Sequence, residues 1–155
     1  MELTYQQSSI LQLLENHLKQ LDNEDQNLDR KAQQNISVST IVIALVTALN
    51  LTQPVPSDER WIFLSLVFLV YVAIFVLSYM ILSPKDWWQP FAPSWEEIDR
   101  VFAKSDQDFY DWQVTLYLGA IDNNRKITVW KVRRIQTTNL LIAADLLLIF
   151  LAAAS

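Results

Sequence analysis

The segment WIFLSLVFLVYVAIFVLSYMIL, residues 61–82, decides the fold class of this chain. It contains no charged residue, no glycine and no proline, and its length fits the roughly 20 residues that a helix needs to cross a bilayer. The lipid interior offers no water to the backbone N–H and C=O groups, so a spanning segment of this kind must satisfy them within a helix. We therefore predict a transmembrane helix over residues 61–82.

Two further segments have the same character. ISVSTIVIALVTALNLT, residues 36–52, lies at the lower limit of spanning length. IQTTNLLIAADLLLIFLAAAS, residues 135–155, reaches the roughly 20 residues that a spanning helix needs. The loop QPVPSDER joins residues 36–52 to residues 61–82, and its two prolines favour a tight turn. The sequence thus predicts three transmembrane helices, with residues 36–82 forming a hairpin.

The Lys and Arg residues are unevenly distributed about these spans. Of the twelve in the chain, only Arg60 lies in the hairpin loop, whereas the others precede the first predicted span or lie between the second and the third. Because loops rich in Lys and Arg stay in the cytoplasm, we predict a cytoplasmic N-terminus and a cytoplasmic segment 83–134. The hairpin loop and the C-terminus are then expected outside.

The cytoplasmic segments continue the spans as helices. Residues 1–35 lack proline and glycine, and their apolar side chains recur at alternating intervals of three and four, which is the seam of a coiled coil or helical bundle. The leucines of this seam are Leu11, Leu14, Leu18, Leu21 and Leu28. They are expected to pack within the subunit or between subunits.

The second cytoplasmic segment begins with a proline-rich elbow. Two capping signals follow, SWEE at residues 94–97 and SDQD at residues 105–108, and the second opens a proline-free run into the third span. The predicted fold is therefore an all-α integral membrane protein with three transmembrane helices. Two long helices extend from the spans into a cytoplasmic helical bundle.

Composition argues against catalysis and against metal or cofactor binding. The chain has no cysteine, one glycine and a single histidine, His17, which has no neighbouring ligand residues. It contains no glycine-rich phosphate loop, no nucleophile elbow and no paired carboxylates in an apolar setting. The net charge of −5 argues against binding to double-stranded DNA. We expect no catalytic residue, no metal and no cofactor.

A basic cluster precedes the third predicted span. Its members are Arg125, Lys126, Lys131, Arg133 and Arg134. One interpretation is a topology signal that touches lipid headgroups. The alternative is an anion site for the phosphate of a nucleotide or oligonucleotide, because Arg side chains suit phosphate geometry.

Asp145 interrupts the third span near its middle. It lies roughly 16 Å along the helix from Arg134, which places it near the bilayer midplane, where a carboxylate facing lipid is costly. The expected polar partners on the first span are Ser37, Thr40 and Thr47. Two interpretations stay open: a ring of Asp145 side chains lining the pore of a homo-oligomer, or a buried structural hydrogen bond.

The order of elements, with AIDNNRKITVWKVRRIQTTNLLIAADLLL (120–148) running into the last span, resembles the small transmembrane effectors of bacterial anti-phage systems. These are the Pycsar transmembrane effectors and their SLATT-like relatives. The resemblance implies a homo-oligomer in the bacterial inner membrane that permeabilises it when a nucleotide second messenger or a partner protein acts. Unlike those effectors, these 155 residues are not expected to include a separate nucleotide-sensing domain. The competing interpretation is a membrane-anchored adaptor that recruits a partner through its cytoplasmic helices.

Overall fold

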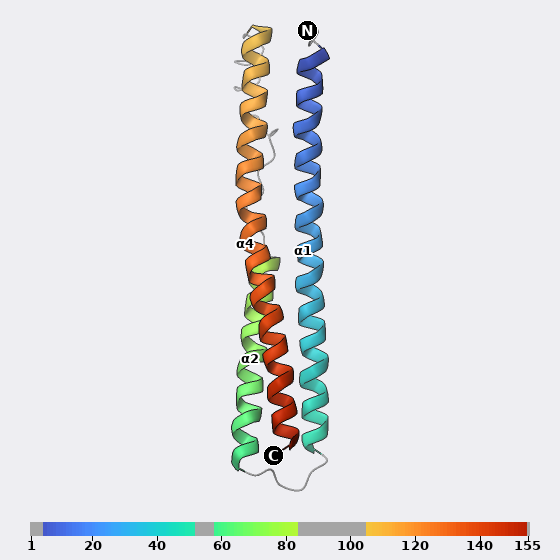
Figure 1. Cartoon of the computed structure of the whole chain (residues 1–155), viewed down its shortest axis with the longest axis vertical. Coiled ribbons are helices and arrows are strands. Elements are labelled where there is room, and N and C mark those ends of the chain that lie inside the picture. The colour runs from blue at the N-terminus through green and yellow to red at the C-terminus, as the bar shows by residue number, and fades with distance from the viewer. Residues whose placement is uncertain (1–4, 52–57, 84–104, 155) are drawn as a thin grey trace. The chain divides into compact units, whose positions relative to one another are not determined.

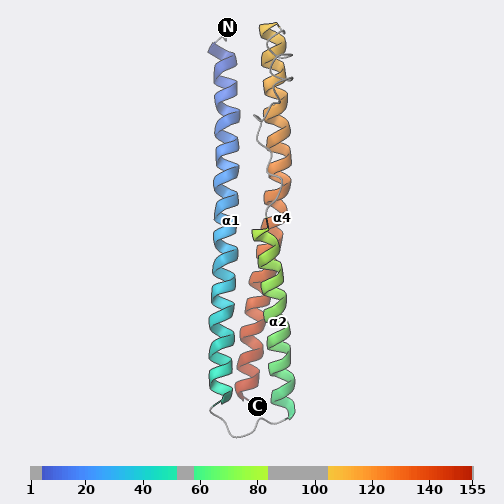
Figure 2. The same ribbon diagram turned by 180° about the vertical axis from the view of Figure 1, so that it is seen from behind.

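The protein is all-α, as the sequence predicts. The computed structural model describes residues 5–51, 58–83 and 105–154. These ranges contain three helices, α1 (Tyr5–Leu51), α2 (Asp58–Leu82) and α4 (Asp106–Ala154) (Figures 1 and 2). The predicted cap at residues 94–97 and most of the elbow before it lie outside the described residues.

Helix α4 begins where the SDQD signal predicts. The backbone N–H of Asp108 donates a hydrogen bond to Ser105 Oγ at 3.2 Å, and the Ser105 hydroxyl donates to the Asp108 carboxylate at 2.6 Å. This reciprocal contact satisfies an N–H group that the first helical turn leaves without an intrahelical partner. Asp106 and Asp108 also place negative charge at the positive end of the helix dipole. The predicted helix start at Ser105 is confirmed, with Ser105 as the N-cap residue.

The chain divides into two units. The first, which we call the polar unit, comprises Met1–Gln26 and Lys85–Val129; the second, the apolar unit, comprises Asn27–Pro84 and Trp130–Ser155. Helices α1 and α4 each contribute residues to both units, whereas α2 belongs to the apolar unit alone.

In the polar unit, the leucine seam of α1 faces inward. Leu14 and Leu21 are buried, and Leu11 and Leu18 are half-buried. Gln7 donates a hydrogen bond to Gln107 at 3.2 Å, which links the beginnings of α1 and α4. The buried side chains that α4 contributes to this unit are Ala120, Asn124 and Thr128.

In the apolar unit, segments of all three helices share one core. Leu28 and Ala32 of α1 pack with Ile81 of α2 and Ile135 of α4. In both views the C-terminal half of α4 lies beside α1 and α2, and α2 runs in the opposite direction to the other two (Figures 1 and 2). The hairpin order of the sequence therefore produces a unit of three helical segments.

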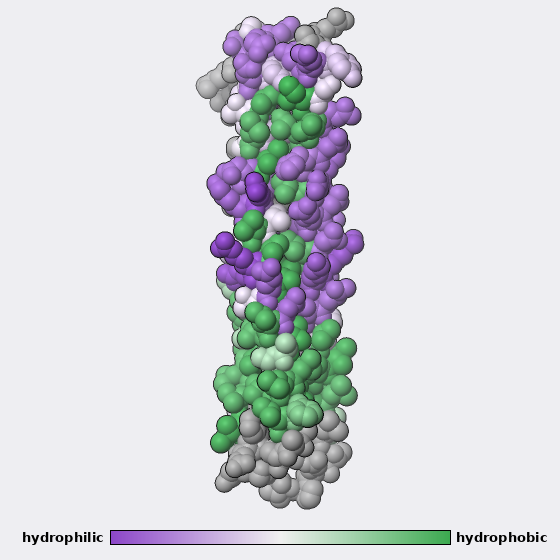
Figure 3. Space-filling view, in the orientation of Figure 1, coloured by the Kyte–Doolittle hydropathy of each residue, from purple (hydrophilic) through white to green (hydrophobic). Residues whose placement is uncertain are grey.

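The outer surface of the apolar unit is strongly hydrophobic. Large apolar side chains are exposed on every helix, among them Ile41 and Leu45 of α1, Phe68 and Leu69 of α2, and Phe150 of α4. Figure 3 shows this unit as a hydrophobic surface, whereas hydrophilic residues dominate the polar unit. Exposing such a surface to water costs free energy, whereas exposing it to lipid does not.

Two of the helices are long and apolar enough to cross a membrane. They contain the segments Leu64–Leu82 in α2 and Asp106–Leu151 in α4. The first predicted span, residues 36–52, is not among these candidates. Its residues up to Leu51 form the end of α1. A span in α1 stays a prediction.

Candidate functional site: a buried polar row in the apolar unit

Three polar side chains of α4 lie buried at heptad spacing. Lys131, Thr138 and Asp145 are all buried, and Asp145 is only 2% exposed. Side chains seven residues apart lie on the same face of a helix, so the three form a row that points into the apolar unit. We call this set the polar row.

The row begins with an ion pair. Lys131 Nζ donates to Asp29 Oδ1 of α1 at 2.8 Å, and the side chains are 5% and 35% exposed, respectively. A buried ammonium is tolerated only when it is paired, because removal from water penalises the charged form. Asp29 therefore stabilises the inward position of Lys131 and joins α1 to α4.

Arg134 has a different set of contacts. Its Nη1 donates to the Met80 sulfur of α2 at 2.8 Å, and its guanidinium lies 4.0 Å from the ring centroid of Trp130. The stacking is a cation–π contact. Arg134 is thus held against α2 and Trp130 by contacts on two sides.

A second contact sets the register of α1 against α4. Asn35 Nδ2 donates to Asn139 Oδ1 at 2.9 Å. Ser39 lies four residues beyond Asn35, and Asp145 lies six residues beyond Asn139. At 1.5 Å per residue, their axial levels differ by only about 3 Å. The buried Ser39 and Asp145 therefore belong to one level of the unit.

A second polar level is formed by Ser78 and Thr138. Both side chains are fully buried, and Ser78 lies two residues before Met80, the neighbour of Arg134. Because α2 runs against α4, Ser78 and Thr138 lie within about one helical turn of each other along the axis. The Thr138 hydroxyl donates to the Arg134 carbonyl at 2.9 Å.

Several polar atoms around this row are buried without protein partners. Within the described ranges, Oγ of Ser39, Oγ of Ser78 and Oδ1 of Asp145 have no hydrogen-bond partner. Leaving a buried donor or acceptor unsatisfied costs about 1–3 kcal/mol. Groups of this kind call for water, a proton or another ligand. The interior of the apolar unit therefore holds three buried polar atoms that the described protein groups leave unsatisfied.

The polar residues predicted on the first span take other positions. Ser37, Thr40 and Thr47 are exposed, and each hydroxyl donates to the carbonyl four residues earlier in α1. The buried hydroxyl of this part of α1 belongs instead to Ser39. The described geometry does not place the three predicted side chains around Asp145.

The predicted basic cluster is divided between different environments. Lys131 is buried with Asp29, and Lys126 forms an exposed ion pair with Asp122 at 2.6 Å. Arg125 and Arg133 are exposed on α4. The five basic side chains therefore do not converge on a single point.

Asp29, Ser39 and Ser78 were not anticipated from the sequence. A signal existed for Ser39, since it lies seven residues after the buried Ala32 and continues the 3,4 spacing of the leucine seam. Ser78 lies in a helix that is apolar on every face. The spacing of its apolar residues therefore does not indicate which face is buried. Asp29 adjoins the seam residue Leu28, where charged residues that pair between helices are common.

Comparison with protein families, curated proteins and solved structures finds no match to this chain.

Proposed function

We propose that this protein is a homo-oligomeric, pore-forming effector of the bacterial inner membrane. Three spans are assigned, comprising residues 36–52, 61–82 and 135–155. The support is the combination of an apolar outer surface with a polar row inside the same unit. The observation that carries the proposal is Asp145, a buried carboxylate within the third predicted span with an oxygen that no described residue satisfies.

In this proposal the described arrangement is a closed state. Asp145 points into its own subunit, so a conducting state requires α4 to turn or separate from its neighbours. Hydration of the unsatisfied oxygens then offsets part of the lost packing, at about 1–3 kcal/mol for each group. Carboxylates from several subunits attract cations to a constriction.

The polar unit is the proposed receiver of the trigger. Helices α1 and α4 each contribute residues to both units, and in this proposal a change in the packing of the polar unit passes along these two helices. The trigger is a nucleotide or oligonucleotide second messenger or a partner protein. For a phosphate ligand, the exposed Arg125 of the polar unit is the better candidate, since Lys131 is occupied by Asp29.

Ion flux through liposomes containing the purified protein tests this function. Thr138→Val changes a buried hydroxyl of the row, and Thr137→Val makes the same change at the adjacent exposed residue. We expect Asp145→Asn to change cation preference and Thr138→Val to change conductance. The control Thr137→Val should have the same conductance as the unmodified protein. A protein that stays silent under every trigger contradicts the proposal.

The second candidate function is a membrane-anchored adaptor. It is favoured by exposed apolar side chains on the polar unit, where Ile10 and Leu13 lie three residues apart on α1 and Leu118 lies on α4. Residues at this spacing form a helix-in-groove recognition surface. An adaptor conducts no ions, and replacing Leu13 with Asn should then abolish partner recruitment without affecting membrane insertion.

A further inference from the structure

A group of basic side chains lies at one end of the apolar segments. Arg30 and Lys31 are exposed on α1, Arg133 is exposed on α4, and Arg134 is half-buried beside α2. We call these four residues the basic collar. The predicted spans, residues 36–52 and 135–155, follow in the two long helices, after the short polar run 33–35 in α1 and immediately after Arg134 in α4.

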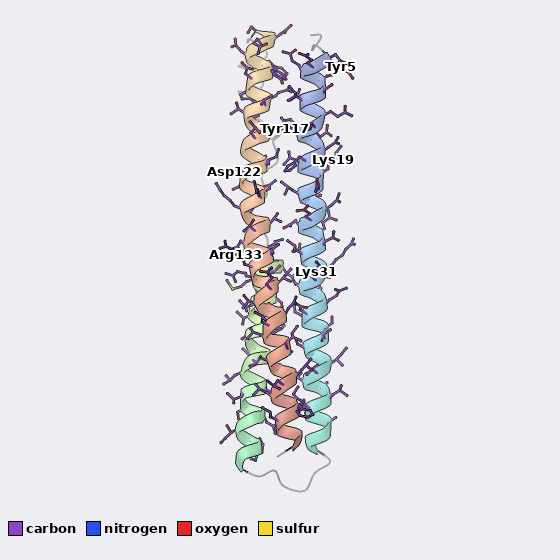
Figure 4. All side chains as sticks on the ribbon, viewed as in Figure 1. Tyr5, Lys19, Lys31, Tyr117, Asp122 and Arg133 are labelled. Carbon is purple, nitrogen blue, oxygen red and sulfur yellow. The ribbon has the colours of Figure 1, made fainter. Side chains whose placement is uncertain are left out.

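The buried ion pair brings the collar to one level. Asp29 and Lys131 are in contact, Arg30 and Lys31 follow Asp29 directly, and Arg133 and Arg134 lie two and three residues beyond Lys131. All four are therefore within about 5 Å of the ion pair along the helix axes. Figure 4 shows the labelled Lys31 of α1 and Arg133 of α4 at nearly the same height.

The collar is a local excess of positive charge in a chain of net charge −5. Asp29 neutralises Lys131, which leaves the four collar charges. The segments 30–40 and 130–140 contain no Asp or Glu. Trp130, under the Arg134 guanidinium, adds an amphipathic ring of the type found where lipid meets water.

We propose that the basic collar binds the phosphate of anionic phospholipid headgroups in the cytoplasmic leaflet. The inference rests on the membrane placement in the proposed function. A soluble nucleotide carries the same phosphate chemistry, but two features favour lipid. The charges are distributed over two helices at one level, and they border the hydrophobic surface that acyl chains would cover. Arg suits the phosphate because its planar fork presents paired donors.

The test is titration of short-chain phosphatidylglycerol or phosphatidylcholine into the full-length protein in neutral detergent, with binding followed by native mass spectrometry. We expect phosphatidylglycerol to bind more tightly. Each collar charge contributes roughly a fivefold factor near an anionic surface, so Arg133→Gln/Arg134→Gln should weaken binding by about 25-fold. The variant Arg30→Gln/Lys31→Gln, at two exposed residues, should show a similar loss of phosphatidylglycerol affinity. It replaces the first variant in the test if that variant does not fold.

The matched control is Arg125→Gln/Lys126→Gln, which removes two charges of α4 from the polar unit. It should bind phosphatidylglycerol as the unmodified protein does. Equal affinity for the two lipids overturns the proposal, as does a loss in the control that equals the loss in the collar variants. Competition by ATP or a cyclic dinucleotide at the collar, without lipid preference, assigns the site to a soluble phosphate instead.

Ion flux separates this inference from the proposed function. A protein that conducts but does not discriminate between the two lipids contradicts the collar alone. Selective lipid binding by a protein that never conducts contradicts the pore alone.

Discussion

Asp29 and Lys131 are joined by a 2.8 Å ion pair in which the two partners differ in exposure, 35% for the carboxylate and 5% for the ammonium. Because of this difference in exposure, replacing one residue should cost more stability than replacing the other. Loss of Asp29 leaves a buried ammonium without its counter-charge, whereas loss of Lys131 leaves a carboxylate that water still reaches.

The first prediction follows from that inequality. Asp29→Asn should lower the free energy of unfolding by about 2–3 kcal/mol, and Lys131→Met by about 1 kcal/mol, because only the first strands a buried charge. The double variant should recover most of the loss caused by Asp29→Asn. Thermal and urea unfolding in detergent, followed by circular dichroism, measures these differences. Equal losses for the two single variants would show that the ion pair is solvated.

The second prediction concerns the stability cost of Asp145. Its buried carboxylate oxygen lacks a partner among the described residues, so Asp145→Leu should raise the free energy of unfolding by about 1–3 kcal/mol. The same variant should abolish ion flux, because the cation-attracting group is gone. Unfolding and flux are measured on one preparation. A destabilised Asp145→Leu protein would instead indicate a structural hydrogen bond.

The third prediction tests the close packing around Ser78. Ser78 is fully buried and Ser65, on the same helix, is exposed. Ser78→Ile should therefore destabilise the apolar unit by about 1–3 kcal/mol through overpacking. Ser65→Ile, the matched control, should change stability by less than about 0.5 kcal/mol. Both are read from thermal unfolding, and identical values for the two variants would place Ser78 at the surface.

The fourth prediction distinguishes core from surface in the polar unit. Leu21 is 6% exposed and Leu13 is 68% exposed. Leu21→Ala should cost about 2–4 kcal/mol because it leaves a cavity, whereas Leu13→Ala should be almost neutral. The measurement is resistance of this unit to proteolysis together with urea unfolding. If Leu13→Ala proves the more damaging change, the leucine seam faces the other way.

The fifth prediction concerns alkaline pH. Burial raises the pKa of Tyr117 above its ordinary value of 10.0, the Glu15 carboxylate raises it further, and Lys19 opposes both. The folded state therefore holds the phenolic proton more tightly than the unfolded chain. Its contribution to stability is present below pH 10.0 and is lost as the pH rises through the higher pKa of the folded state.

Tyr117→Phe should consequently remove part of the decline in stability above that pH. Unfolding at neutral and alkaline pH measures the effect, and phenolate absorbance reports the titration directly. A wild-type protein and a Tyr117→Phe variant with identical alkaline profiles would contradict the assignment.

The sequence by itself determined the helices and their inward seam. Proline and glycine are nearly absent from residues 5–51 and 106–154, so nothing interrupts helical hydrogen bonding there. The cap at Ser105 was readable because a hydroxyl and a carboxylate three residues apart satisfy the first turn locally. The leucine spacing in the polar unit was readable because polar residues occupy the other faces of α1.

Only the tertiary structure decided which polar side chains meet. In a segment that is apolar on every face, periodicity cannot select the inward one, since burial of any face gains similar free energy. The packing of three helices against one another made that choice: it turned Ser39 inward and Ser37, Thr40 and Thr47 outward. Likewise, Lys131 had the same sequence context as its basic neighbours, and Asp29, about one hundred residues away in the chain, provides the counter-charge that allows its burial.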